Sequence, residues 1–196
     1  MPPSRLCFIG DSFVQGCGDP EALGWVGRVC ADRLALGHDL TAYNLGIRGQ
    51  TSGQIACRWY AESLPRLSAH PFEQRGLVFS FGANDAAQMI APDQTHAHTQ
   101  SILDQARLLA PVLMVGPAPI ADSPASDAPL QHLCQMMAQC AKQRQIAYLP
   151  IFSDLRHNQS WMAEAVSGDG AHPAAGGYAA LAELVRRWDA WRDWFR

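Results

Sequence analysis

Residues 5–18 read RLCFIGDSFVQGCG. The first half is an apolar run too short for a helix, and it stops at Gly10, before an acid, a hydroxyl and a glycine-rich loop. This pattern predicts a buried strand that ends in a sharp turn. The turn presents Ser12 at the carboxyl end of a strand, where open α/β sheets bind their ligands. Alone, the motif is more typical of a turn or a helix cap than of a nucleophile, so the assignment depends on partners elsewhere in the chain.

The composition narrows the class of protein. A length of 196 residues fits a single domain over residues 1–196 with a full hydrophobic core. The formal net charge is −3 and no Lys/Arg cluster stands out, so we expect no nucleic-acid partner. The six cysteines include no Cys-x-x-Cys pair and are expected to be reduced.

The same composition bears on location and assembly. No apolar run approaches the length of a membrane span, and the Ser12 loop begins too near Met1 for a signal peptide. We therefore predict a cytoplasmic protein with no integral membrane segment. The sequence leaves a homo-oligomer open, and the Trp-rich end of the chain is more typical of a core or a subunit contact than of a membrane anchor.

Strands alternate with helices along the chain. Short apolar or alternating runs predict strands at residues 5–10, 40–45, 76–81, 111–115 and 146–151. Apolar stripes at helical spacing predict helices at residues 24–36, 51–64, 92–110, 130–145 and 174–195, with Pro65 helping to stop the second. Parallel strands need crossover connections, so the pattern predicts a three-layer α/β/α sandwich around a five-stranded parallel sheet.

Four short motifs fall on loops after predicted strands or before the last helix. They are Gly10-Asp11-Ser12, Asn44-Leu45-Gly46, Gly82-Ala83-Asn84-Asp85 and Asp169-Gly170-Ala171-His172. A serine hydroxyl becomes a good nucleophile only when a base takes its proton, and the base needs a group that holds its tautomer. His172 can be this base, and Asp169, three residues earlier on the same loop, can accept its hydrogen bond. Only Ser12 must then be brought in by the fold.

In this order the four motifs resemble the four blocks of the SGNH hydrolases, the GDSL-type esterases and lipases. Phe13 stands where the family name has Leu, which bears on the pocket lining and not on the chemistry. The resemblance implies a flavodoxin-like topology and a catalytic triad of Ser12, Asp169 and His172. It also implies an oxyanion hole formed by the backbone N–H groups of Ser12 and Gly46 and the side-chain amide of Asn84.

The function implied is hydrolysis of a small-molecule carboxylic ester through an acyl-enzyme, with no metal and no cofactor. A thioesterase or an acyltransferase would use the same triad. A flavodoxin-like domain could instead bind a flavin after the first strand without catalysis, although Asp11 and Asp19 would repel its phosphate. Asp11 is expected to support its turn, and Asp85 to cap a helix or support Asn84.

Metal and cysteine chemistry have weaker candidates. His96 and His98 are close enough in sequence for metal ligands, but they lie in a polar helix start with no Cys or carboxylate set, so we expect them to face solvent. Cys17 lies beside Ser12 without a nearby histidine, which makes it a poor nucleophile.

The substrate pocket is the part that the sequence defines least. Its candidate walls are Phe13, Trp25, Asp85, residues 86–90 and a long Pro-, Ala- and Ser-rich loop at residues 116–129. No apolar groove of lipid length is evident. We therefore predict short-acyl or acetyl esters as substrates.

Overall fold

The computed structural model describes residues 3–67, 74–121 and 124–196. In these residues five strands form one parallel sheet in the order β2-β1-β3-β4-β5. The strands are β1 (Ser4–Gly10), β2 (Leu40–Gly46), β3 (Gln74–Ser80), β4 (Val112–Val115) and β5 (Ala147–Leu149). The order is that of flavodoxin-like sheets, and each strand overlaps one that the sequence predicts, so the predicted fold class is confirmed.

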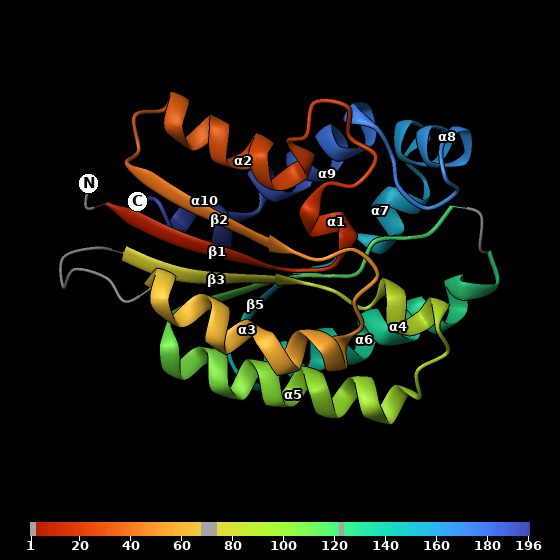
Figure 1. Cartoon of the computed structure of the whole chain (residues 1–196), viewed down its shortest axis with the longest axis horizontal. Helices are drawn as coiled ribbons and strands as arrows, with labels where there is room; N and C mark the ends of the chain where they lie inside the picture. Colours follow the sequence, from red (N-terminus) through yellow and green to blue (C-terminus); the bar gives the residue numbers. More distant parts are fainter. Residues whose placement is uncertain (1–2, 68–73, 122–123) are drawn as a thin grey trace.

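Helices cover both faces of the sheet (Figure 1). One face carries α2 (Gly24–Ala35), α9 (Ala175–Arg187) and α10 (Asp189–Asp193), and the other carries α3 (Ser52–Leu67), α5 (Pro92–Leu109) and α6 (Asp127–Gln143). Alternate residues of β1 enter the two cores: Leu6 and Phe8 pack on the α2 and α9 side, and Cys7 and Ile9 on the other. Burial on both faces explains why this strand reads as a continuous apolar run.

The carboxyl edge of the sheet carries short elements that prepare the site. These are α1 (Ser12–Gln15) after β1, α4 (Ala83–Ala87) after β3, and α7 (Phe152–Arg156) and α8 (Gln159–Ser167) before α9. The chain leaves β1 for β2 on one side and then crosses to β3 on the other, so the strand order reverses at β1. In open α/β sheets, the loops that follow the two strands at such a reversal diverge and leave the crevice in which substrates bind. In Figure 1, α1, α4 and the segment between α8 and α9 lie at this end.

Three predicted boundaries are wrong. The last helix does not run to Phe195, because Trp188 has an extended ψ of 122° that ends α9 and starts α10. The break turns the chain so that Trp191 packs on Phe8, with ring centroids 6.1 Å apart. Pro65 does not stop α3, which continues to Leu67, because a proline in the last turn removes one hydrogen bond while buried Leu67 still packs on the core.

The third correction concerns the long loop. It ends before residue 129, in a 3₁₀ turn at Pro124–Ser126 and the start of α6 at Asp127. Residues 122–123 of this loop lie outside the described residues. The wall predicted from residues 116–129 is therefore partly a helix start.

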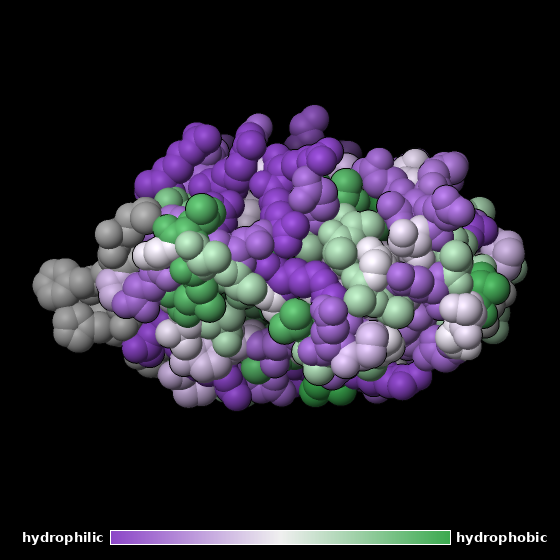
Figure 2. Space-filling view, turned by 90° about the horizontal axis from the view of Figure 1, so that it is seen from above, coloured by the Kyte–Doolittle hydropathy of each residue, from purple (hydrophilic) through white to green (hydrophobic). Residues whose placement is uncertain are grey.

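The face with α2 and α9 is mainly hydrophilic, and its apolar surface is divided into separate patches (Figure 2). Among the described residues, no helix has both the length and the apolar composition needed to cross a membrane.

Candidate active site

Ser12 is the first residue of α1, directly after β1. The Asp11 side chain caps this helix by accepting the Phe13 N–H at 2.9 Å, which confirms the expectation that Asp11 supports its turn. The Ser12 N–H is in the first helical turn and has no helical acceptor. Gly46 lies so close to α1 that a Cβ there would come within 2.2 Å of the Gln15 nitrogen. Glycine at position 46 therefore lets β2 approach the helix that carries Ser12.

The loop between α8 and α9 brings Asp169 and His172 to the same crevice. His172 Nε2 lies 2.7 Å from Ser12 Oγ, and His172 Nδ1 lies 2.7 Å from Asp169 Oδ2. Ser12 is 3% exposed and His172 is 9% exposed, whereas Asp169 is partly open to solvent. The structure thus brings together three residues that the sequence singled out, across 160 positions of the chain.

Asp169 is held as an anion. Burial acts to raise its pKa, but hydrogen bonds from the backbone and imidazole of His172 and from the Ala171 N–H outweigh this, so the pKa of Asp169 lies well below its usual value. Its Oδ1 accepts the His172 N–H at 2.9 Å and the Ala171 N–H at 3.1 Å. These two bonds fix the carboxylate on its own loop while Oδ2 faces the imidazole.

The other two groups of the expected oxyanion hole, those of Gly46 and Asn84, already donate hydrogen bonds within the protein. The Gly46 N–H donates to Asn44 Oδ1 at 3.0 Å, and Asn44 Nδ2 donates to the Val14 carbonyl at 2.8 Å. Asn84 Nδ2 donates to the Gln50 carbonyl at 3.0 Å. An amide NH₂ has two N–H groups, so Asn84 keeps a second donor, whereas Gly46 has to leave Asn44 before it can bind another acceptor.

Two residues near Asn84 in the chain, Gly82 and Asp85, fix the position of the helix that carries it. Gly82, which precedes α4, has a φ of 118°, in the left-handed region that favours glycine. Asp85 is fully buried and accepts the Ser52 N–H at 2.9 Å and the Thr95 hydroxyl at 2.9 Å, together with the Ser52 hydroxyl. Asp85 thus caps the first turn of α3 from outside that helix, and it holds α4 against α3 and α5.

A second buried carboxyl, that of Asp11, directly precedes Ser12 in the chain. Asp11 is 2% exposed, and burial raises its pKa from 3.8 to about 7, with the Phe13 N–H acting against this shift and the charge of Asp85 adding to it. The Asp11 carboxyl is thus close enough to Asp85 for their charges to interact.

Comparisons with known proteins show which family the chain belongs to. The sequence profile of the GDSL-like Lipase/Acylhydrolase family matches residues 8–180, which is most of the chain. The chain belongs to this family. It is therefore a GDSL-type carboxylic ester hydrolase, as the four motifs suggest.

Solved structures of other proteins share the fold. Axe2, an acetylxylan esterase from Geobacillus stearothermophilus, superposes with a TM-score of 0.78 at 20% identity, covering 93% of this chain and 92% of its own. TesA gives a TM-score of 0.77 at 25% identity and covers 93% of this chain and 96% of its own. A search of curated proteins finds no match.

The residues predicted to line the pocket of this GDSL-type hydrolase take different places. Trp25 is 1% exposed and packs edge-on against Phe8 with centroids 5.7 Å apart, so its prediction as a pocket wall is corrected: it is a core residue. Phe13 is 4% exposed and lies between the His172 and Trp161 rings, at centroid distances of 5.1 and 5.7 Å. Phe13 thus packs mainly against the His172 imidazole, and little of its side chain lines an open pocket.

A hollow between α4 and the start of α6 matches the other predicted walls better. It has a volume of about 260 Å³ and is bordered by Asp85, Ala86, Met89, Ile90, Pro129 and Leu133. Most of this lining is apolar. The Asp85 carboxylate is committed to Ser52 and Thr95, so Asp85 borders this space as part of the scaffold.

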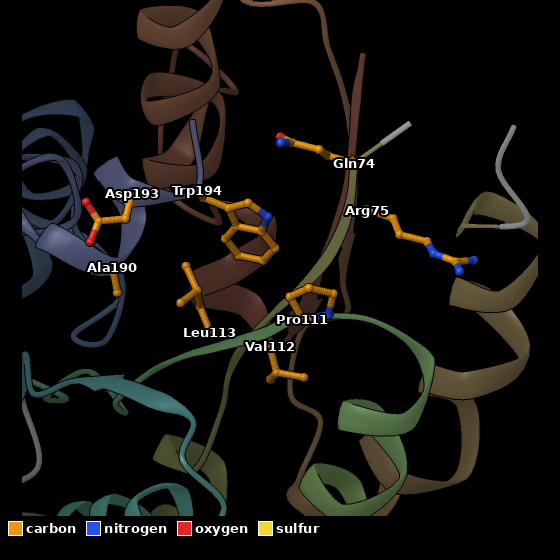
Figure 3. A pocket seen from close by; sticks show the side chains of 8 residues that line it. All are labelled: Gln74, Arg75, Pro111, Val112, Leu113, Ala190, Asp193 and Trp194. Atoms are coloured by element: carbon orange, nitrogen blue, oxygen red, sulfur yellow. The ribbon is translucent and has the colours of Figure 1, made fainter. Parts of the chain in front are cut away.

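A larger hollow, of about 440 Å³, lies at the opposite end of the sheet (Figure 3). Gln74 and Val112 line it, and these residues begin β3 and β4, whereas Ser12 follows the end of β1. The Trp194 ring faces Leu113 and Pro111 there. The hollow belongs to the amino edge of the sheet and has no part in the serine site of the hydrolase.

Sequence reasoning missed two features of the site. Arg48 Nη2 donates to Asp169 Oδ2 at 2.9 Å, and His98 Nδ1 lies 3.0 Å from Ser52 Oγ. His96 and His98 are both partly buried, which corrects the expectation that they face solvent. Within the described ranges, no three His, Cys, Asp or Glu side chains gather as a metal site would require. The only signal for Arg48 was its place two residues after Gly46.

Proposed function

We propose that this ester hydrolase is a serine esterase in which Ser12 is the nucleophile, His172 the general base and acid, and Asp169 the group that orients His172. The observation that carries the proposal is the unbroken line of hydrogen bonds from Ser12 Oγ through the His172 ring to Asp169, with 2.7 Å at each step. This line ends at a serine in the crevice of the sheet, where substrates reach α/β enzymes.

Acylation follows from this order. His172 Nε2 accepts the Ser12 hydroxyl proton while Oγ attacks the ester carbonyl carbon, and the imidazolium is stabilised by ionised Asp169. The tetrahedral intermediate then collapses, the C–O bond to the alcohol breaks, and His172 returns the proton to the leaving oxygen. Water repeats the sequence on the acyl-enzyme, releases the acid and restores Ser12.

The negative charge on the carbonyl oxygen needs hydrogen-bond donors. The free Ser12 N–H and the second N–H of Asn84 are the donors available without rearrangement. The Gly46 N–H joins them when substrate displaces its Asn44 acceptor, which is a partly exposed side chain. We therefore assign the larger share of oxyanion stabilisation to Asn84 and Ser12.

Axe2 supports the assignment by analogy. Its catalytic mutants replace a serine, an aspartate and a histidine by alanine, and that aspartate and histidine are three residues apart, as Asp169 and His172 are. The serine of Axe2 also lies near the start of its chain.

Short acyl groups are the proposed substrates. The apolar hollow between α4 and the start of α6 has a volume of about 260 Å³, below the range of pockets that hold drug-sized ligands. The α2 and α9 face offers only separate apolar patches (Figure 2). A cytoplasmic location and a homo-oligomer stay predictions.

The test combines labelling and turnover. A fluorophosphonate probe should form one adduct on Ser12, located by peptide mass spectrometry, and the kcat/KM for p-nitrophenyl esters should be highest for acetyl to butyryl chains. Parallel assays with a thioester and with an added alcohol acceptor separate hydrolysis of esters from thioester cleavage and acyl transfer. An adduct on another residue, or ester turnover that survives complete labelling, would contradict the mechanism.

A further inference from the structure

Arg48 occupies a place in the site that the hydrolysis mechanism above does not use. Its guanidinium donates to Asp169 Oδ2 at 2.9 Å, and the same oxygen accepts His172 Nδ1 at 2.7 Å. Arg48 comes from the loop after β2, 121 positions away from Asp169. An arginine and the proposed base thus share a single acceptor atom.

The loop that carries Arg48 is fixed on both sides of it. On one side, the Ile47 N–H donates to the Gly10 carbonyl at 3.1 Å. On the other side, the Gln50 carbonyl accepts Asn84 Nδ2 at 3.0 Å, and the Gly49 carbonyl accepts Gln88 Nε2 at 3.2 Å. The loop therefore joins the strand before Ser12 to the helix of Asn84, and Arg48 adds the link to Asp169.

The ion pair between Arg48 and Asp169 contributes little to the stability of the fold. The Arg48 side chain is 65% exposed and the Asp169 side chain 43% exposed, and exposed pairs contribute little to the free energy of folding. Asp169 is also already fixed on its own loop by two backbone N–H groups. The effect of Arg48 is therefore expected in the chemistry of the oxygen that it shares with His172.

We propose that Arg48 is a positioning residue of the esterase: its guanidinium holds Asp169 Oδ2 against His172, and its positive charge favours the neutral imidazole that acts as the base. The positive charge opposes a second positive charge on the nearby ring and competes for the carboxylate that would stabilise it. This inference rests on the proposed function.

Other ionisable groups around His172 and Asp169 have to be considered. They lie on the turn after β1, on α8 and on α9, and they are Asp11, Cys17, Asp19, Glu164 and Tyr178. Burial raises the pKa of Cys17 and of Tyr178, so both stay neutral near pH 7. Burial raises the pKa of Asp11 to about 7, so Asp11 also changes its charge near neutral pH. The experiment therefore has to measure the protonation of the His172 ring directly.

The experiment is a ¹⁵N NMR titration of the His172 imidazole, assigned with His172→Gln, in the wild type, Arg48→Gln, Arg48→Lys and Arg187→Gln. Arg187 is the matched control, because it forms a similarly exposed pair with Glu183, 77% and 42% exposed, within α9. The same variants are assayed for the pH dependence of kcat/KM on an acetyl ester.

In Arg48→Gln the midpoint of the His172 titration and the acid limb of kcat/KM should both rise by about 0.5 to 1 pH unit at low salt, and less in high salt. Arg48→Lys, which keeps the charge, should move them by less than half as much, and Arg187→Gln should not move them. The melting temperature of Arg48→Gln should stay near that of the wild type.

Coincident profiles of the wild type and Arg48→Gln would overturn the inference, even if Arg48→Gln loses activity at all pH values. The proposed function fails in a different way. If the midpoint rises but no ester hydrolysis depends on Ser12, the esterase mechanism is wrong while Arg48 still sets the charge of His172.

Discussion

Two clusters in this molecule each join a serine, a histidine and an aspartate. In the crevice cluster, His172 stands in the middle, between Ser12 and Asp169. In the buried cluster, Ser52 stands in the middle, with its hydroxyl on Asp85 and its Oγ 3.0 Å from His98 Nδ1. The residue types are identical, and the order of connection differs.

The order decides what each hydroxyl can do. The Ser12 proton faces an imidazole that can take it, next to a crevice. The Ser52 hydroxyl donates to a carboxylate, and its oxygen accepts from His98, in a side chain with no exposed surface. The buried cluster therefore ties helices together, and the crevice cluster is free to react. Matched substitutions in the two clusters test this difference.

The serines should give the largest contrast. Ser12→Ala should lower kcat by about 10⁴- to 10⁶-fold with little change in stability, because it removes the nucleophile alone. Ser52→Ala should keep most of the activity and lower the free energy of unfolding by about 1 to 3 kcal/mol, because Asp85 loses a buried donor. Ester turnover and urea denaturation of both variants measure the contrast. Near-normal activity in Ser12→Ala would refute it.

Asp169 and Asp85 should differ in the same way: a substitution of Asp169 should lower activity, and a substitution of Asp85 should lower stability. Asp169→Asn should lower kcat by about 10⁴-fold, since an amide cannot hold the imidazole tautomer that leaves Nε2 free to accept a proton. Asp85→Asn should cost about 2 to 3 kcal/mol of stability, because its NH₂ would face the Ser52 N–H or a hydroxyl donor. A stable Asp85→Asn with unchanged melting would mean that this carboxylate is not holding α3, α4 and α5 together.

Asn84 links the two clusters, because it belongs to the proposed oxyanion hole and adjoins Asp85. Asn84→Ala should lower kcat by about 10²- to 10³-fold. Gln88→Ala is the control, since Gln88 also donates to the loop after β2, at 3.2 Å from the Gly49 carbonyl, and has no expected part in catalysis. Equal losses in the two variants would show that loop support, and not oxyanion binding, explains the effect.

The last contrast concerns Asp11, and it should appear in the pH dependence of stability and not in turnover. Its pKa is raised by burial from 3.8 to about 7, so the native state binds the proton more tightly than the unfolded chain does. The stability that this proton contributes is present below about pH 4 and is lost as the pH rises through 7. In Asp11→Asn, which can still cap α1, this loss should be absent. The difference between the two stability curves from pH 4 to 8 isolates Asp11, and parallel curves would contradict the raised pKa.

The sequence predicted those parts of the molecule that repeat a simple pattern. Buried strands such as β1 read as apolar runs, and the Asp169-Gly170-Ala171-His172 motif carries two interacting residues on one short loop. Such features depend on neighbours in the chain, so periodicity and spacing suffice to find them.

Features that depend on distant residues were missed. Nothing near Ser52 in the sequence marks its contact with Asp85, 33 positions away, or with His98, 46 positions away. From the sequence alone, Trp25 fits a pocket wall as well as a core position. Only its contact with Phe8 in the folded structure identifies it as a core residue. The break at Trp188 likewise follows from the place that Trp191 takes on the sheet, which helical periodicity cannot show.

The separation of 160 positions between Ser12 and His172 also has a consequence for biosynthesis. Chains grow at about 5 to 20 residues per second, so Ser12 is synthesised roughly 10 to 30 seconds before His172. During that interval the nascent chain carries a serine hydroxyl without a proton acceptor. If the proposed mechanism is correct, hydrolytic activity begins only after the segment that carries His172 has been synthesised and has folded onto the segment that carries Ser12.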